Sequence, residues 1–238
     1  MKRVHFLRHG QALHNPRAEA ARHGGCDFDT FLRLMKEDDA FDAELTELGR
    51  LQAHDAASIG NSSTLAVNLV VSSPLSRALD TAMLVLAEAT QRSTTAFVAH
   101  DSLRERSGWM LNAKRRTRSE QAARYPSCDF AQLETEEDEL WDRLGDELEP
   151  TSEVAERGYQ LLRWVSARDE SDVAIVAHGG LFHYLLNEHA KVKADEKAAA
   201  RFGNCELRSF QLSWTGSGEE REFVIASDPE GPAGPGPS

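Results

Sequence analysis

Short apolar runs alternate with segments of helical periodicity along this chain. Four runs have the length of buried strands and are bounded by polar or turn-forming residues. They cover residues 4–7, 68–71, 97–99 and 173–177. Strands separated by helices in this way predict an α/β fold, with a mainly parallel sheet that helices cover on both faces.

The segments between the runs carry apolar residues at helical spacing. Thr46 and Ser152 are expected to be the N-caps of two of these helices. We expect helices over residues 47–59, 75–88, 152–168 and 181–189, and a helical insertion over 116–141. Residues 15–42 combine loop and helix, and their apolar side chains are expected to pack over a site as a lid. These side chains are Phe28, Phe31, Leu32, Leu34 and Met35.

Alternation and turn residues near the C-terminus predict a hairpin. Residues 206–214 alternate in β fashion, a Thr-Gly-Ser-Gly turn follows at 215–218, and residues 223–225 return. The hairpin would add antiparallel pairing at one edge and complete a three-layer sandwich. Residues 228–238 contain four prolines and three glycines. We therefore expect a single domain over residues 1–227 and a disordered tail over 228–238.

Two of the predicted strands end in histidine. Arg8 and His9 follow the first run, His178 follows the last, and glycine comes next in both places. The carboxyl ends of strands open into the crevice where α/β sheets bind ligands, and glycine lets a ligand approach the backbone. The two histidines are therefore expected to share one site.

Composition indicates a soluble single-domain protein. The 238 residues are 40% hydrophobic and carry a net charge of -12. No apolar stretch approaches the roughly 20 residues that span a bilayer, and the first strand starts too early to leave room for a signal peptide. Cys26, Cys128 and Cys205 are widely spaced, which is typical of reduced thiols. We expect a cytoplasmic protein that does not act at a membrane.

The charge is unevenly distributed. Residues 134–149 contain nine acidic residues against one basic residue, with apolar residues at helical spacing. An amphipathic helix with a solvated acidic face is the main interpretation, and a partner-binding patch is the alternative.

A block of opposite charge consists of Lys114, Arg115, Arg116 and Arg118. It is either a solvated helix start or a positive rim that attracts anionic substrates. The acidic chain, without interleaved aromatic residues in this block, argues against a nucleic-acid partner.

Five motifs follow one another in a fixed order between residue 3 and about residue 210. They are Arg8-His9-Gly10 with Asn15, Leu45-Thr46 with Gly49, Gln52 and Ala53, Ser72 to Ala78 with Thr81 and Ala82, Leu103-Arg104-Glu105, and His178-Gly179-Gly180. Together they resemble the histidine phosphatase (phosphoglycerate mutase-like) superfamily over nearly the whole chain. The resemblance implies the three-layer fold and a catalytic domain over residues 1–227.

The resemblance also implies roles for individual residues. His9 would be the nucleophile that becomes phosphohistidine, His178 the electrostatic stabiliser and Glu105 the proton donor. The remaining candidates, which would bind phosphate or substrate, are Arg8, Asn15, Arg77 and Gly179. The chemistry fits, because arginine pairs bidentately with phosphate and imidazole serves as a neutral nucleophile or, protonated, as a hydrogen-bond donor near neutral pH.

Glu105 has an alternative interpretation. It lies between Arg104 and Arg106, so it could be a salt-bridged surface residue. The next acids to consider in that case are Glu19, Asp27 and Asp101.

We expect neither a metal ion nor another cofactor. Two arginines and a second histidine suffice to neutralise a phosphoryl group, and the other histidines are scattered along the chain. His178 and His183 are five residues apart, a spacing that does not share a helical face. His14, next to Asn15, is the one further histidine expected near the substrate.

These observations predict a metal-independent phosphomonoester hydrolase acting on a small molecule or a phosphopeptide. The first alternative is a cofactor-dependent phosphoglycerate mutase. Such mutases typically carry Arg-His-Tyr-Gly after the catalytic glutamate and tryptophan before the asparagine. Here Glu105 is followed by Arg-Ser-Gly-Trp, and His14 precedes Asn15, which favours hydrolysis. The second alternative is a binding module on the same fold. The substrate's identity and the oligomeric state stay open.

Overall fold

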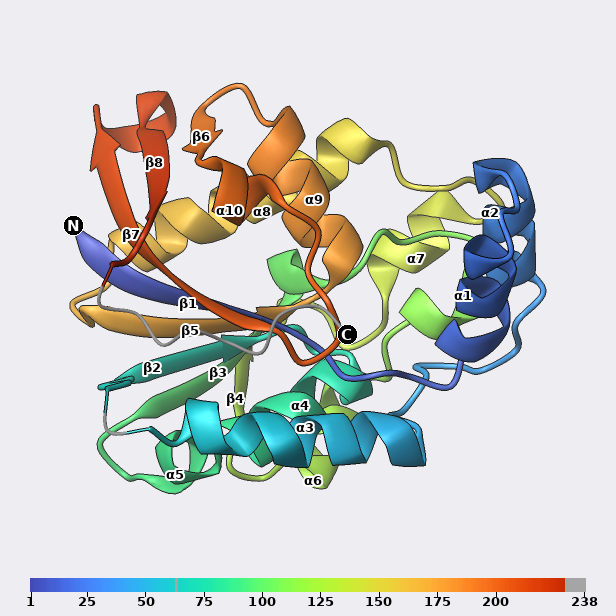
Figure 1. Ribbon diagram of the computed structural model, residues 1–238, viewed down its shortest axis with the longest axis horizontal. Helices are drawn as coiled ribbons and strands as arrows, with labels where there is room; N and C mark the ends of the chain where they lie inside the picture. Colours follow the sequence, from blue (N-terminus) through green and yellow to red (C-terminus); the bar gives the residue numbers. More distant parts are fainter. Residues whose placement is uncertain (63, 230–238) are drawn as a thin grey trace.

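The computed structural model describes residues 1–62 and 64–229, and within them eight strands form one sheet. The strands are β1 (Lys2–Arg8), β2 (Leu69–Ser72), β3 (Ala96–His100), β4 (Asp129–Gln132), β5 (Asp172–Ala177), β6 (Val192–Ala194), β7 (Leu207–Thr215) and β8 (Glu222–Ser227). Their order across the sheet is β4-β3-β2-β5-β1-β7-β8-β6 (Figure 1).

Pairing within the sheet is parallel from β4 to β1 and changes at β7. β1 pairs in parallel with β5 and antiparallel with β7, and β8 is antiparallel to β7. The short strand β6 runs parallel to β8 and forms the outer edge. The mainly parallel sheet with antiparallel C-terminal pairing, predicted from the sequence, is confirmed. β6 was not predicted from the sequence.

Helices cover both faces of the sheet. They are α1 (Asn15–His23), α2 (Phe28–Lys36), α3 (Glu47–Gly60), α4 (Ser76–Val85), α5 (Ala87–Gln91), α6 (Arg118–Arg124), α7 (Glu139–Leu144), α8 (Thr151–Ser166), α9 (Gly179–Glu188) and α10 (Glu196–Ala199). Short 3-10 turns are η1 (Asp101–Leu103), η2 (Leu111–Ala113) and η3 (Gly218–Glu220). Helices α8 and α9 lie on one face and α3 and α4 on the other, while α1 and α2 form a lobe at the side (Figure 1).

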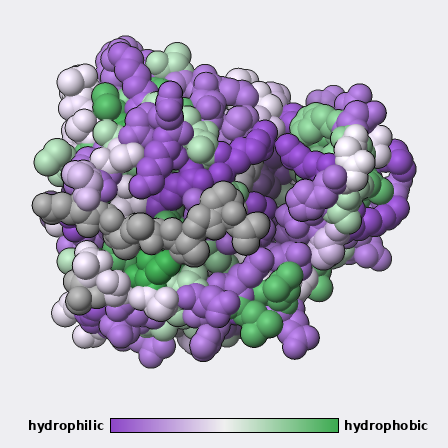
Figure 2. Space-filling model, in the orientation of Figure 1, coloured by the Kyte–Doolittle hydropathy of each residue, from purple (hydrophilic) through white to green (hydrophobic). Residues whose placement is uncertain are grey.

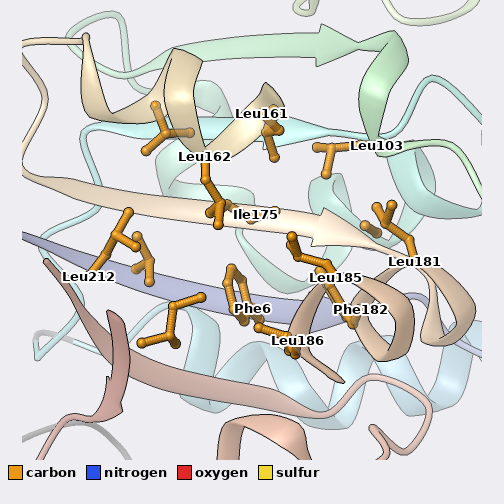
Figure 3. Close-up of a cluster of buried hydrophobic side chains, with 14 of the residues drawn as sticks. Phe6, Leu103, Leu161, Leu162, Ile175, Leu181, Phe182, Leu185, Leu186 and Leu212 are labelled. Atoms are coloured by element: carbon orange, nitrogen blue, oxygen red, sulfur yellow. The ribbon is translucent and has the colours of Figure 1, made fainter. Parts of the chain in front are cut away.

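Alternation along the strands fills two separate cores. Phe6 and Ile175 face the core that α8 and α9 cover, whereas Leu7 and Val176 face the core beneath α3 and α4. In Figure 3, side chains of α8 and α9 such as Leu162 and Phe182 point toward those of β1 and β5. Burial on both faces explains why these strands read as nearly continuous apolar runs.

The predicted helical insertion at 116–141 is wrong in its middle. β4 interrupts it and pairs with β3, with Phe130 buried and both neighbours exposed. Pro126 follows Tyr125, the C-cap residue of α6, and its missing N–H is incompatible with continuing the helix. The acidic helix expected over 134–149 is likewise only the six residues of α7.

Several helix boundaries also differ from expectation. Helix α8 starts at Thr151, because the carbonyl of Pro150 already accepts the N–H groups of Glu153 and Val154, so Ser152 is inside the first turn and is not the N-cap. Helix α9 starts at Gly179, not at residue 181. The expected helix over 75–88 breaks into α4 and α5. In contrast, Thr46 caps α3 as predicted and accepts the N–H of Gly49.

The remaining expectations concern the lid, the tail and the membrane. The segment expected as a lid forms α1 and α2. Residues 230–238 of the predicted tail lie outside the described residues. In the two ranges that the structure describes, no helix combines the length and the apolar character required to cross a membrane. The face in Figure 2 is mostly hydrophilic, with apolar residues in small groups.

Candidate active site

Sheet register brings His9 and His178 together. Arg8 pairs with Ala177 across the parallel β1 and β5, so the next residues leave the sheet at the same level. The His9 backbone N–H donates to the Ala177 carbonyl at 3.1 Å, and the imidazole centroids of His9 and His178 are 4.9 Å apart. The expectation that the two histidines would share one site agrees with this geometry.

Hydrogen bonds assign the tautomer of His9. Its Nδ1 lies 2.6 Å from the carbonyl oxygen of Gly10, and a carbonyl can only accept, so Nδ1 carries the hydrogen. Nε2 therefore keeps its lone pair, with Arg77 Nε donating to it at 3.3 Å. Burial, followed by the nearby charges of Arg77 and Arg8, holds the pKa of His9 well below its usual 6.5. His9 is thus a neutral imidazole with Nε2 available as a nucleophile.

Two arginines lie near His9 and contribute positive charge to its surroundings. Arg77 stands in the first turn of α4, is fully buried, and donates from Nη1 to the carbonyl of Asn112 at 2.7 Å. Burial lowers its pKa to about 10, which still leaves it charged at neutral pH. Arg8 donates from Nη1 to the carbonyl of Phe202 at 2.8 Å, and its Nη2 lies 3.5 Å from a carboxylate oxygen of Glu19.

His178 is also a neutral donor. Its Nε2 lies 2.8 Å from Ser73 Oγ, and that oxygen already accepts the N–H of Leu75. The Ser73 hydroxyl hydrogen can then go to His178 Nε2, which puts the ring hydrogen on Nδ1. Burial, then the charge of Arg77, lowers the pKa of His178 well below 6.5. The sequence suggested a cationic donor, whereas this environment favours the neutral ring.

Glu105 is anchored through backbone N–H groups. Its carboxylate oxygens accept the N–H of Gly180 at 3.1 Å and of Arg106 at 2.8 Å. The neighbouring arginines turn elsewhere, since Arg104 pairs with the buried Asp138 and Arg106 donates to the carbonyl of Glu149. No ion pair with Glu105 is found in the described part of the chain, so its surroundings differ from those of a salt-bridged surface residue.

Asn15 and Gly179 line the same cavity. Asn15 Oδ1 accepts the N–H of Ala12 at 2.9 Å, which orients the amide so that Nδ2 lies 3.2 Å from His14 Nε2. One amide hydrogen is therefore directed to His14. A Cβ at Gly179 would stand 3.3 Å from Arg8 Nε, so this glycine allows the guanidinium to lie against the start of α9.

A cavity of about 1070 Å³ opens above His9. Side chains from the α1–α2 lobe line one wall, and Glu105 and the start of α9 line another. Phe31, Leu32 and Met35 are among these lining residues, as expected of a lid. Arg77 and His178 do not line the cavity and are completely buried next to His9.

Within residues 1–62 and 64–229, four buried nitrogens around His9 have no hydrogen-bond partner. They are Arg8 Nε, His14 Nδ1, Arg77 Nη2 and His178 Nδ1. Unpaired buried donors are costly, and oxygen atoms of an anion are the natural acceptors for them. The arrangement can therefore hold a phosphoryl group against His9 Nε2.

For some residues that build the site, no role was predicted from the sequence. Ser73 lies inside a quoted motif, so its position was visible although its bond to His178 was not. Arg157 of α8 had no local signal. It donates to the carbonyls of Ser102 and Arg104 and pairs with Glu149, and it thereby fixes the loop that presents Glu105.

The basic block does not form a rim to the cavity. Arg115 is buried and donates to three carbonyls of residues 135–137. Lys114 lies 3.3 Å from Asp142, and Arg118 lies 3.5 Å from Glu136. None of these side chains lines the cavity. Arg116 lies 3.2 Å from the buried Asp42. The basic side chains are therefore used in contacts with the acidic segment at 134–149 and with Asp42, so the interpretation as a substrate-attracting rim is not supported.

In the part of the chain that the structure describes, no three His, Cys, Asp or Glu side chains are grouped so that they could hold a metal ion. His5 is one of the scattered histidines, and its two ring nitrogens are hydrogen-bonded to the side chains of Ser209 and Asp172.

Comparison with known proteins identifies relatives of this chain. The chain is 33% identical to phosphoglycerate mutase-like protein 1 of Arabidopsis thaliana, over 89% of this chain and 81% of that protein. It is 30% identical to glucosyl-3-phosphoglycerate phosphatase of Mycobacterium tuberculosis, over 81% and 84%. The structure of the mycobacterial phosphatase with inorganic phosphate superposes with a TM-score of 0.56 at 25% identity, covering 98% of this chain and all of that one.

The model of the histidine phosphatase superfamily (branch 1) matches residues 4–222. This match confirms the resemblance found in the sequence, together with the expectation of an enzyme from a family that includes phosphatases. The chain therefore belongs to branch 1 of the histidine phosphatase superfamily.

Proposed function

We propose that this protein is a metal-independent phosphomonoester hydrolase that works through a phosphohistidine at His9. The observation that carries the proposal is the neutral His9 ring, whose Nε2 lone pair is surrounded by buried donors without partners. Family membership and the phosphatases among the relatives support hydrolysis. The chain's own guanidinium groups neutralise the charge of the phosphoryl group, and its neutral imidazole rings add hydrogen-bond donors.

In the first step His9 Nε2 attacks phosphorus and the bond from phosphorus to the ester oxygen breaks. Arg8 and Arg77 balance the charge on the phosphoryl oxygens, and His178 donates from Nδ1. Glu105, in its protonated form, gives its proton to the departing alkoxide. The hydrogen on His9 Nδ1 stays on that nitrogen and keeps its hydrogen bond to the Gly10 carbonyl throughout, so the ring becomes an N-phosphoryl imidazolium paired with the phosphoryl oxygens.

In the second step water attacks phosphorus in the phosphohistidine. Glu105, now a carboxylate, takes a proton from that water, and the bond from phosphorus to Nε2 breaks. Inorganic phosphate leaves, and His9 and Glu105 return to their starting protonation states. Splitting the transfer in this way needs no group outside the site.

Rapid quench with a ³²P-labelled phosphomonoester tests the covalent step. Label should be trapped on His9 under alkaline quench and should be absent in His9→Ala. His54→Ala removes an exposed histidine of α3 that does not line the cavity, so it serves as the matched control and should retain label. Label on serine, or unchanged turnover in His9→Ala, would exclude the covalent-histidine mechanism. Activity should also survive prolonged incubation with EDTA.

Hydrolase and mutase make opposite predictions for products. With 3-phosphoglycerate and a trace of 2,3-bisphosphoglycerate, we expect little 2-phosphoglycerate, whereas other monoesters release inorganic phosphate. A panel of sugar phosphates, nucleotides, glucosyl-3-phosphoglycerate and phosphopeptides then identifies the substrate class. Rapid isomerisation with negligible phosphate release would assign the mutase activity instead.

A further inference from the structure

His14 is a buried polar residue, and in the described part of the chain only one of its two ring nitrogens has a hydrogen-bond partner. It precedes α1 as its N-cap residue, is 4% exposed, and its ring centroid lies 6.4 Å from that of His9. Both rings line the same cavity. The catalytic scheme above does not use His14, although its ring lies beside that of His9 in this cavity.

The hydrogen bonds of Asn15 determine which nitrogen of His14 carries hydrogen. Asn15 Oδ1 is committed to the N–H of Ala12, so the group facing His14 Nε2 at 3.2 Å is the amide NH₂, a donor. His14 Nε2 therefore accepts, and the hydrogen sits on Nδ1 in the neutral ring. Burial, followed by the charges of Arg77 and Arg8, lowers the pKa of His14 well below 6.5 and favours this neutral form.

Nδ1 of His14 is buried without a partner in the described residues. It is one of the four such nitrogens named above, and the other three belong to side chains that already have roles in the proposed mechanism. The first turn of a helix also favours negative charge, and His14 stands at the start of α1. Both observations point to an anionic oxygen as the acceptor.

We propose that His14 is a fourth phosphoryl-binding residue, which donates Nδ1–H to a non-bridging oxygen of the group held against His9. The proposal rests on the proposed phosphatase function of this site. Because a neutral imidazole adds a donor without adding a third cation beside Arg8 and Arg77, it stabilises the anion and leaves His9 nucleophilic. His14 also connects the α1–α2 lobe directly to the reacting group.

Three substitutions separate the two nitrogens of the ring. His14→Asn keeps an N–H donor one bond from Cγ, where Nδ1 was, and loses the group at Nε2. His14→Gln loses the donor at Nδ1 but keeps a carbonyl that can accept from Asn15. His14→Phe keeps a planar ring and loses both. Thermal unfolding of each variant shows whether it is folded before the other measurements are compared.

The measurement is binding of inorganic phosphate by titration calorimetry, together with kcat and KM on an active monoester. A hydrogen bond to a charged group predicts a loss of about 10- to 100-fold in phosphate affinity and kcat/KM for His14→Phe and His14→Gln. His14→Asn should recover most of both. Retained function in His14→Gln with loss in His14→Asn would overturn the proposal and assign support of Asn15. Equal loss in all three variants would assign packing, and unchanged affinity in His14→Phe would also overturn it.

Phosphate binding keeps this test separate from the proposed function. If the wild-type protein binds phosphate but hydrolyses no monoester, the phosphatase proposal fails while the comparison of His14 variants still decides the role of Nδ1. If the wild-type protein hydrolyses monoesters and the His14 variants bind phosphate as it does, only the inference about His14 fails.

Discussion

Replacing Gly180 with alanine should displace the carboxylate of Glu105 while residue 105 itself stays unchanged. A Cβ at position 180 would stand 2.3 Å from Glu105 Oε1, 3.0 Å from Cδ and 3.1 Å from Oε2. The first distance is far below van der Waals contact, so one group must move. The three nearest atoms all belong to the end of a flexible side chain and none to the backbone. The carboxylate is therefore displaced, while the fold is kept.

The expected magnitudes for stability and catalysis point in different directions. Alanine inside a helix is more favourable than glycine by about 0.5 to 1 kcal/mol, so the free energy of unfolding of Gly180→Ala should change by no more than about 1 kcal/mol. A displaced proton donor costs about 10²- to 10⁴-fold on alkyl or sugar phosphates, whose leaving oxygen is strongly basic. The cost on p-nitrophenyl phosphate should be clearly smaller, because that leaving group is stable as an anion.

A double-mutant cycle with Glu105→Gln completes the assay. Glu105→Gln removes the ionisable proton and should show the same dependence on leaving group. Because both substitutions remove one function, Gly180→Ala should add little further loss in the Glu105→Gln background. Equal losses on both ester types, or full additivity of the two substitutions, would refute the assignment of Glu105 as proton donor.

Three further outcomes follow from the contacts. Glu149→Gln weakens the ion pair that holds the Glu105 loop, so kcat on alkyl phosphates should fall by about tenfold with little change in phosphate affinity; equal falls in both would contradict a positioning role. Burial lowers the pKa values of His9, His14 and His178 below 6.5, so the unfolded chain binds protons more readily. The free energy of unfolding should then decline below pH 6.5, by up to about 1.4 kcal/mol per pH unit for each histidine, and a flat profile from pH 7.5 to 5 in denaturant titrations would refute this. Gly60→Ala places a Cβ 2.0 Å from a backbone carbonyl oxygen of α4, so the melting temperature should fall by several degrees while kcat/KM is retained; an unchanged melting temperature would show that α3 and α4 can separate without cost.

The main features of the fold could be predicted because buried strands require apolar residues, and these are visible in the sequence. β1 and β5 are covered on both faces, so each appears as an apolar run, and the polar residue that ends the run marks the carboxyl edge of the sheet. That edge is where His9 and His178 meet. Short peripheral strands leave a weaker mark. β4 and β6 have three or four residues each, and their pairing depends on partners that are distant in sequence.

The site could be predicted only in part, because the protonation and orientation of its side chains depend on groups that are distant in sequence and on backbone atoms. The sequence pointed to the histidines, the arginines and Glu105, but it could not assign their protonation or hydrogen bonds. The tautomer of His9 depends on the Gly10 carbonyl. The orientation of Arg77 depends on the carbonyl of Asn112 in a distant 3-10 turn, and every residue type supplies a carbonyl. For the basic block the prediction failed in the opposite way, because charge alone suggested a substrate rim, whereas in the structure Lys114 and Arg118 pair with the acidic segment and Arg116 pairs with Asp42.

Arginines supply permanent charge at this site, while histidines supply lone pairs and neutral donors. A buried guanidinium remains charged even when its pKa falls to about 10, as for Arg77, whereas a buried imidazole between two guanidinium groups loses its proton. The same burial therefore keeps the cations that attract a phosphoryl group and deprotonates the ring that must attack it. Replacing either arginine with a neutral residue would weaken anion binding and would also raise the pKa of His9. Affinity for phosphate and nucleophilicity at neutral pH are thus linked through the same two side chains, Arg8 and Arg77.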